Sequence, residues 1–412
     1  MTIKQAKTWT IFALAAIIAA AAAPRPTLAS DGKPGKRRLL VSFKEGSTRA
    51  ERERAATNMG LKLADDIDSL QVSVLEAEGD VAEQDVARAR DQPNVVAVEE
   101  DSRRNWLLES PASFQALPMP SVEAALQGLV RPKPRSAPAG LVPWGVGRVN
   151  APAAWPTGEG EGVKVAVIDT GIDCAHPDLR CDLSAGVNLV DPGSPPMDDN
   201  EHGTHVFGTI AGRGNGPKGV FGVAPKATLI PVKVLDADGT GSLSAIVEGI
   251  DWATKAGADV INMSLGGPAG STALQRAVQK ALAAGIVVVC AAGNSGPDPD
   301  TVGFPAGYPG VIAVAASDSA DGVASFSSRG GEVAFIAPGV DIRSTVPGGG
   351  YKKESGTSMA SPHVSGLAAL AIERGAKGPY GVRTALAAAA SRLPGLRATE
   401  EGSGMIDAAL LR

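Results

Sequence analysis

Short apolar runs without polar alternation recur through the C-terminal two thirds of the chain. They are rich in Val, Ile and Ala and occupy residues 163–168, 229–235, 260–263, 286–290 and 311–315. A strand buried on both faces has no need to alternate, so these runs predict parallel strands covered by helices. Residues 243–256 and 272–284 have helical spacing. Alternating strands and helices predict a three-layer α/β domain with a mostly parallel sheet over residues 141–412.

A smaller and more polar unit precedes this domain. Its apolar runs and helical segments follow one another as strand 39–43, helix 48–59, strands 61–70 and 71–75, helix 81–92 and strand 95–98. This β-α-β-β-α-β order is typical of a ferredoxin-like α+β unit. The unit is too small to be the main domain.

The segments before and after this small unit have a different composition. Lys4 and Lys7 precede an apolar run at 9–23, and small residues around Ala29 offer a cleavage point, so residues 1–29 are expected to be an export signal. A retained anchor is the alternative, although the run is short for a membrane span. Residues 105–140 contain scattered Pro without periodicity and are interpreted as an exposed linker.

Charge and cysteine content exclude several classes of function. The formal net charge of −5 argues against a nucleic-acid-binding protein. Cys174 and Cys181 lie close together in a polar loop and are expected to pair in an exported protein. Cys290 ends an apolar run, so a buried thiol is expected there. The sequence contains no Cys-x-x-Cys pair of the kind used by zinc fingers and thioredoxins.

Two polar residues follow predicted strands, where α/β folds place their ligand sites. Asp169 ends the first strand of the main domain and lies in Asp169-Thr-Gly, which also matches the aspartic peptidase signature. Those enzymes need two such carboxylates, and the chain has one Asp-Thr-Gly. Asn294 follows the strand at 286–290. Its amide could donate to an oxyanion, or Asn294-Ser-Gly could be only a turn.

Histidine and serine supply the remaining candidates. His202 and His205 stand three apart and could share a helical face that binds a metal, but a zincin would need Glu after the first His. A structural His pair is the other interpretation. Ser358 lies where a tight turn enters a helix, as either a nucleophile or a helix N-cap.

Taken in order, the segments around these four residues closely resemble the subtilisin-like serine peptidases. They are Val167-Ile-Asp169-Thr-Gly, His202-Gly-Thr-His205-Val, Ala291-Ala-Gly-Asn294-Ser-Gly and Gly356-Thr-Ser358-Met-Ala-Ser-Pro-His363. The resemblance covers nearly all of residues 141–412. It implies that Ser358 is the nucleophile, His202 the general base and Asp169 its orienting carboxylate. It also implies that Asn294 and the Ser358 backbone N–H form the oxyanion hole, and that His205 is structural.

The same resemblance marks a substrate cleft. Residues that look like its walls, edge strand and pocket base are Gly239, Gly241, Leu243, Ile246, Ser264, Leu265, Gly266, Ala291, Gly293 and Gly303. Gly at 266, 293 and 303 leaves the main pocket open and uncharged, which favours large apolar residues before the cut. A cis X-Pro bond is implied at Pro305.

The resemblance to the family's calcium site is only partial. Asp178 and Asn215 stand where side-chain ligands are expected, but Gly140 replaces a Gln ligand. A structural calcium ion and a solvated loop Asp therefore both remain open, and no cofactor is expected for catalysis.

The sequence as a whole predicts a secreted, monomeric serine endopeptidase of broad specificity that acts on proteins and peptides. Residues 30–104 look like the family's inhibitory propeptide, removed by self-cleavage between Arg103 and Val142. Retention in a periplasm or cell envelope is an alternative location. A narrow processing peptidase and a catalytically silent binding protein are the alternative functions.

Overall fold

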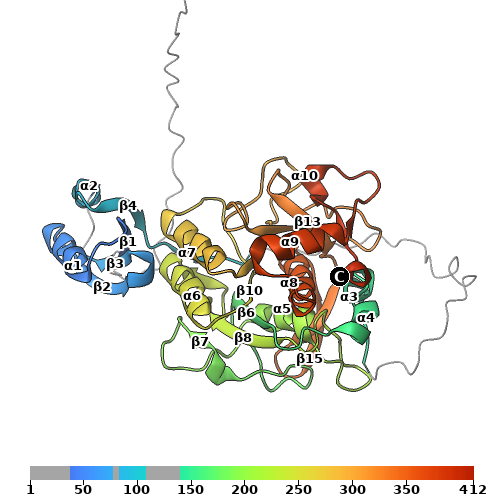
Figure 1. The fold of residues 1–412 in the computed structure, drawn as a ribbon. Helices are drawn as coiled ribbons and strands as arrows, with labels where there is room; N and C mark the ends of the chain where they lie inside the picture. The colour runs from blue at the N-terminus through green and yellow to red at the C-terminus, as the bar shows by residue number, and fades with distance from the viewer. Residues whose placement is uncertain (1–37, 78–82, 108–139) are drawn as a thin grey trace, which may run out of the picture. The chain divides into compact units, whose positions relative to one another are not determined.

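The structure is a computed structural model that describes residues 38–77, 83–107 and 140–412. The expected export signal and most of the expected linker lie outside the described residues. Figure 1 traces the chain from the small N-terminal unit to the C-terminal helices of the main domain. Among the described helices, none is long and apolar enough to cross a membrane.

The N-terminal unit has the predicted order of elements. These are β1 (Arg38–Phe43), α1 (Arg49–Asn58), β2 (Lys62–Ile67), β3 (Val72–Glu76), α2 (Glu83–Arg90) and β4 (Val95–Glu100). The strands form an antiparallel sheet in the order β2-β3-β1-β4. This confirms the ferredoxin-like prediction.

Residues from the two faces of this small sheet belong to different apolar clusters. Leu39, Val41 and Phe43 of β1 cluster with α1 residues of the unit itself. Leu40, which points the other way because side chains alternate along a strand, clusters with residues of the main domain. The unit therefore completes the burial of one sheet face only with the help of the main domain.

The main domain is built on a nine-stranded sheet in the order β16-β17-β13-β12-β11-β10-β6-β8-β7. Its longer strands are β6 (Lys164–Asp169), β8 (Thr228–Lys233), β10 (Val260–Met263), β11 (Val287–Ala291), β12 (Ile312–Ser317) and β13 (Val333–Pro338). The shorter ones are β7 (Val187–Asn188), β16 (Ala390–Ser391) and β17 (Met405–Ile406). All neighbours are parallel except β16 and β17, as the apolar runs predict.

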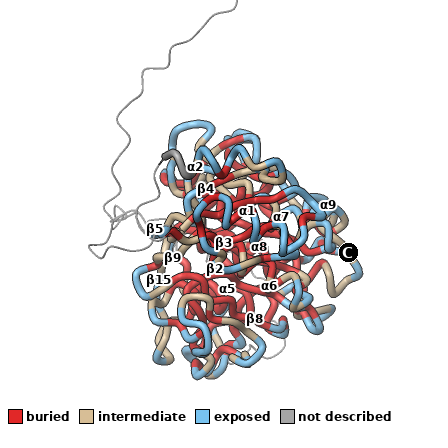
Figure 2. The backbone as a smooth tube through the Cα atoms, turned by 90° about the vertical axis from the view of Figure 1, so that its left-hand side faces the viewer, coloured by how far each residue is buried: buried red, intermediate tan, exposed pale blue. Residues whose placement is uncertain are grey.

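Helices bury both faces of the sheet. On one side, α6 (Leu243–Lys255) and α7 (Thr272–Ala283) cluster with Ala166, Ile168 and Val288. On the other, α5 (His202–Ala211) and α8 (Thr357–Glu373) cluster with Val165, Val167 and Val289. Figure 1 shows these two pairs of helices with the central strands between them, and the buried strands and helices are red in Figure 2.

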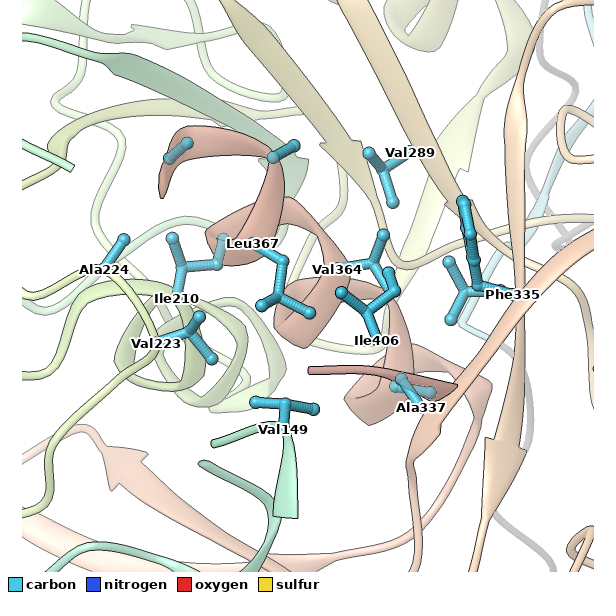
Figure 3. Packing of buried hydrophobic residues seen from close by; sticks show 14 of the residues in the cluster. Val149, Ile210, Val223, Ala224, Val289, Phe335, Ala337, Val364, Leu367 and Ile406 are labelled. Atoms are coloured by element: carbon cyan, nitrogen blue, oxygen red, sulfur yellow. The ribbon is translucent and has the colours of Figure 1, made fainter. Parts of the chain in front are cut away.

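Helix α8 runs through the densest part of this core. Val364 and Leu367 are fully buried, with Val289 and Phe335 on one side and Ile210 and Val223 on the other (Figure 3). Because packing fixes this helix along most of its length, its first turn is held firmly at the edge of the sheet.

Strand β13 reads Val-Ala-Phe-Ile-Ala-Pro, an apolar run of the same kind as the predicted strands, although it was not predicted. The antiparallel hairpin of β14 (Ile342–Val346) and β15 (Gly350–Glu354) was not predicted either. β15 reads Gly-Tyr-Lys-Lys-Glu and has little apolar content, so nothing in its composition marks a buried strand. The hairpin packs against α5 and helps to build the site.

Candidate active site

The structure brings the four predicted residues to the carboxyl end of the central strands. Asp169 is the last residue of β6, and His202 is the first residue of α5. Ser358 is the second residue of α8, and Asn294 follows β11 by three positions. Each side chain therefore starts from a strand end or a helix N-terminus, which limits its freedom to move.

Asp169 and His202 form a buried pair. His202 Nδ1 lies 2.8 Å from Asp169 Oδ1, and the Thr170 N–H donates to the same oxygen at 2.7 Å. Burial lowers the pKa of His202, but attraction to Asp169 outweighs it and raises the pKa to about 9. The contact through Nδ1 leaves Nε2 as the ring atom available for proton transfer.

Asp198 connects the two segments that carry this pair, and the sequence analysis missed it. Its Oδ1 accepts from the Thr170 hydroxyl at 2.8 Å, and its Oδ2 accepts from the Thr204 N–H at 2.8 Å. Since Thr170 follows Asp169 and Thr204 lies in the first turn of α5, Asp198 fixes both. A carboxylate four residues before a candidate His, in a turn-forming sequence, was the available signal.

Ser358 is almost fully buried at the start of α8. Its hydroxyl donates to the backbone oxygen of Ser264 at 3.1 Å, and the Ser264 hydroxyl donates to the Ser358 backbone oxygen at 2.9 Å. His202 Nε2 accepts no hydrogen bond among the described residues. The Ser358 hydroxyl therefore contacts the segment after β10 in this structure and forms no hydrogen bond to the His202 ring.

Asn294 is oriented by the residue that precedes Ser358. The Thr357 N–H and hydroxyl donate to Asn294 Oδ1 at 3.0 and 2.9 Å. Asn294 Nδ2 lies on the side of Gly356, where an added Cβ would come within 3.3 Å of it. This arrangement fixes the amide with its oxygen occupied and its nitrogen on the side of the turn that precedes Ser358, which is compatible with the predicted role of an oxyanion donor.

The predicted cleft residues also assemble. Gly267 and Phe304 exchange backbone hydrogen bonds at 2.9 and 2.8 Å, and the Gly303 N–H donates to the Ala292 oxygen at 2.9 Å. The segment 303–305 therefore connects the segments 264–267 and 291–293, which were predicted to be the walls of the main pocket. The Phe304–Pro305 peptide bond is cis, as the resemblance implies.

The end of the N-terminal unit lies along this cleft. Strand β5 (Arg103–Asn105) pairs antiparallel with β9 (Thr240–Ser242). The Trp106 N–H then donates to the Gly239 oxygen at 3.0 Å, and the Gly266 N–H donates to the Trp106 oxygen at 3.0 Å. The sequence analysis placed residues 105 and 106 in the linker, but they belong to this extended segment. Their pairing could not be predicted because the partner strand β9 is distant in sequence.

Trp106 is the most deeply inserted of these residues. Its side chain is buried in the apolar cluster that includes the predicted pocket residues Leu243, Ile246 and Leu265. The indole N–H donates to the Gly241 oxygen at 2.9 Å. The predicted second pocket therefore accepts an aromatic side chain of the chain itself.

Acidic residues of the N-terminal unit contact two helix N-termini of the main domain. Glu99 accepts from the Thr272 and Ala273 N–H groups of α7 at 2.9 and 3.0 Å. Asp101 accepts from the Ser244 N–H of α6 at 2.8 Å. Such carboxylates satisfy unpaired N–H groups and complement the helix dipoles.

The loop after β6 contains the predicted disulfide and the predicted metal residues. Cys174 and Cys181 are bonded, and Cys290 is a free, buried thiol whose pKa burial raises. Both predictions are confirmed.

Asp178 is fully buried in the same loop. Its carboxylate accepts from the Asn215 and Val220 N–H groups at 2.5 and 2.6 Å and from the Tyr351 hydroxyl at 2.9 Å. Asn215 Nδ2 donates to the Pro177 oxygen at 3.2 Å. Within the described ranges, no group of three or more His, Cys, Asp and Glu side chains could hold a metal.

His205 and His363 are buried outside this pair. His205 Nε2 lies 2.8 Å from the Ile342 oxygen in β14, in agreement with a structural role. His363 Nδ1 lies 2.9 Å from the Met359 oxygen, and burial lowers the pKa of His363 to about 4. His363 is therefore neutral at pH 7.

Comparison with known proteins agrees with this site. Residues 160–405 match the subtilase family, and residues 21–101 match the fervidolysin N-terminal prodomain. The chain belongs to the subtilase family and is a serine endopeptidase with a prodomain.

Individual relatives cover the peptidase domain. Subtilisin of Bacillus pumilus is 53% identical over 237 residues, which are 57% of this chain and 85% of that protein. Subtilisin E of Bacillus subtilis (strain 168) is 53% identical over 237 residues, 57% of this chain and 61% of its own length. Alkaline elastase YaB of Bacillus sp. (strain YaB) is 47% identical over 270 residues, 65% of this chain and 69% of that protein.

Proposed function

We propose that the protein is a secreted, broad-specificity endopeptidase that uses Ser358, His202 and Asp169 as a catalytic triad. The Asp169–His202 contact, which engages Nδ1 and leaves Nε2 without a hydrogen bond among the described residues, is the observation that supports this most strongly. Ser358 Oγ attacks the scissile carbonyl while its proton passes to His202 Nε2. His202 then donates that proton to the leaving amine, and water releases the acyl group by the same route.

The oxyanion of the tetrahedral intermediate is stabilised by two donors. These are Asn294 Nδ2 and the backbone N–H of Ser358, at the positively polarised end of α8. The contacts from Thr357 to Asn294 Oδ1 support this role, because they orient the amide before substrate arrives.

The prodomain inhibits the enzyme and is removed by self-cleavage. Pairing of β5 with β9 supports this, because an extended substrate would use the same edge strand. The described part of the prodomain reaches Leu107 inside the cleft, so the cut is proposed to lie shortly beyond it, within the interval 103–142. Burial of Trp106 near Leu243 and Ile246 supports a preference for large apolar residues in that pocket.

Export from the cell and a structural calcium ion are further parts of this proposal. The apolar segment at 9–23 supports export.

Structural calcium at Asp178 and Asn215 stays a prediction. The three donors to the Asp178 carboxylate compete with calcium, because a cation would have to displace them. A chelator that lowers the Tm by several degrees would favour calcium, and an unchanged Tm would favour the hydrogen-bonded loop.

Replacement of the nucleophile tests the whole proposal. Ser358→Ala should reduce kcat on a denatured protein substrate on the order of a millionfold, the magnitude known for loss of the nucleophile in a subtilisin. The precursor should also remain uncut after the export signal is removed. Ser319→Ala, at an exposed turn, is the control and should mature normally. A Ser358→Ala protein that still matures by itself would rule out the triad and leave a silent or differently built site.

A further inference from the structure

Strand β15 carries two charged side chains next to the first turn of α5. Lys352 Nζ forms an ion pair with Glu201, the residue immediately before His202, and lies 3.6 Å from Glu354 Oε1. Side chains alternate along a strand, so Lys352 and Glu354 share one face and Lys353 lies on the other. Glu201, Lys352 and Glu354 form a row of alternating charge, called here the Glu354 row.

Several contacts fix the Glu354 row relative to α5. Glu354 pairs across the hairpin with Ile342, whose backbone oxygen lies 2.8 Å from His205 Nε2. The Ser344 hydroxyl of β14 donates to the His205 backbone oxygen at 2.7 Å. The Glu354 side chain is only 13% exposed. Its charge therefore acts across protein rather than across bulk water, where screening would weaken it.

The backbone at Glu201 adds a second observation. Glu201 has φ 113°, a left-handed value that favours glycine and is costly for a residue with a side chain. The ion pair to Lys352 holds this residue in place on the Glu354 row. Because His202 follows directly, the row also fixes the backbone from which the imidazole projects.

The charged groups that face His202 come from every element around it. Asp169 from β6 attracts its charged form most strongly, followed by Glu354 from β15 and Asp198 from the preceding loop. His205, on the same helix, is neutral because burial lowers its pKa. Among these three carboxylates, Asp169 pairs directly with His202 and Asp198 has its own hydrogen-bond network. Glu354 is the third, and it is nearly buried.

We propose that Glu354 is a positioning residue that stabilises the imidazolium form of His202, and that Lys352 limits how strongly it does so. The inference rests on the proposed role of His202 as general base. During acylation the Ser358 O–H bond breaks and an N–H bond forms at His202 Nε2, so positive charge develops on the residue that follows Glu201, at the end of the Glu354 row. The same carboxylate favours the protonated imidazole before substrate binds, which moves the working range of the enzyme toward alkaline pH.

Three variants test this through the pH profile of kcat/KM, whose acidic limb reports the free imidazole. Glu354→Gln should move that limb to lower pH by about 0.5 to 1 unit. Lys352→Gln should move it to higher pH by a similar amount, because Glu354 and Glu201 lose their counter-charge. Lys353→Gln removes the same charge from the opposite face and should leave the limb within about 0.2 units.

The opposite shifts distinguish a local field from net charge. Equal shifts in Lys352→Gln and Lys353→Gln, or no shift in Glu354→Gln, would overturn the proposal. The titration of the His202 ring followed by NMR in Ser358→Ala, with and without Glu354→Gln, gives the same answer without turnover. Failure of the proposed function appears instead as activity that persists in Ser358→Ala.

Discussion

The prodomain and the peptidase domain bury their sheets in different ways. In the peptidase domain, every residue of β10, β11, β12 and β13 is buried between helices of the domain itself. In the prodomain, β1 and β3 are mostly buried, but β2 and β4 each have a single buried residue. Leu40 of β1 completes its burial against the peptidase domain. The central strands of the peptidase domain are therefore covered by its own helices, whereas one face of the prodomain sheet packs against the peptidase domain.

Buried charge occurs in both parts of the chain, and in the prodomain it centres on one arginine. Arg52 is fully buried, with an ion pair to Asp66 at 2.7 Å and a second ion pair to Asp68. All four histidines lie in the peptidase domain, so the two parts must respond differently to acid. If the prodomain is cut as proposed, its dependence on a buried ion pair and on an apolar face covered by the peptidase domain would favour its release and digestion.

The largest effect is expected from the buried arginine of the prodomain. Arg52→Met leaves the buried Asp66 carboxylate without its partner and should destabilise the prodomain by about 3–5 kcal/mol. In the Ser358→Ala precursor, amides of β1 and β3 should then exchange hydrogen about two orders of magnitude faster or more. Amides of the peptidase strands should keep their protection.

A second arginine of the same helix is the matched control. Arg49 pairs with Glu53 at 2.9 Å with both side chains largely exposed, so Arg49→Ala should change exchange little. Equal effects of the two substitutions would mean that burial of the Arg52 ion pairs adds nothing to the stability of the prodomain.

The features of the fold and the site that could be predicted from the sequence are those that depend on residues close together in the chain. The apolar runs predicted the central strands, and parallel-sheet geometry marked Asp169 at the end of one of them. Asn294 stayed open between a turn and an oxyanion donor until the resemblance to subtilases was considered. The four segments that resemble subtilases identified His202 and Ser358 through short, contiguous motifs. The Cys174–Cys181 pair was also close in sequence.

What the sequence could not predict depends on contacts between distant residues. Asp198 matters because it bridges two segments that only the fold brings together. Strand β15 is polar and was not predicted, although it carries Lys352 and Glu354. Glu99 and Asp101 read as ordinary charges on a strand, because their helix partners lie more than a hundred residues away.

The buried His363 should make the stability of the peptidase domain depend on pH. The folded pKa of His363 is about 4, below the unfolded value of about 6.5, so the unfolded chain binds the extra proton between these values. Stability from neutral His363 is complete above pH 6.5 and falls as the pH drops toward 4, by roughly 3 kcal/mol at the lower end. The prodomain, which has no histidine, cannot contribute to this loss.

Thermal unfolding of the mature enzyme, inactivated with a phosphonylating serine reagent, measures this effect. His363→Gln keeps a donor for the Met359 oxygen but does not titrate. Its Tm should therefore fall less than that of the unsubstituted enzyme between pH 7 and pH 4.5. Parallel Tm curves for the two proteins would show that His363 is not the group responsible.

The smallest effect is expected where the two parts meet, at the carboxylates of β4. Glu99→Ala removes the acceptor for two N–H groups of α7 and should cost the complex roughly 2 kcal/mol. Once the precursor has cut itself, the prodomain should dissociate about thirtyfold faster, seen as a shorter lag before a fluorogenic peptide is hydrolysed. Glu100, the next residue of the strand, is exposed, and Glu100→Ala should keep the original lag. If both substitutions shorten the lag equally, general charge attraction holds the prodomain. If only Glu99→Ala shortens the lag, the N-terminus of α7 is a specific contact of the prodomain. The affinity of the prodomain for the peptidase domain then depends on single carboxylates, whereas the central strands of the peptidase domain are held by apolar packing.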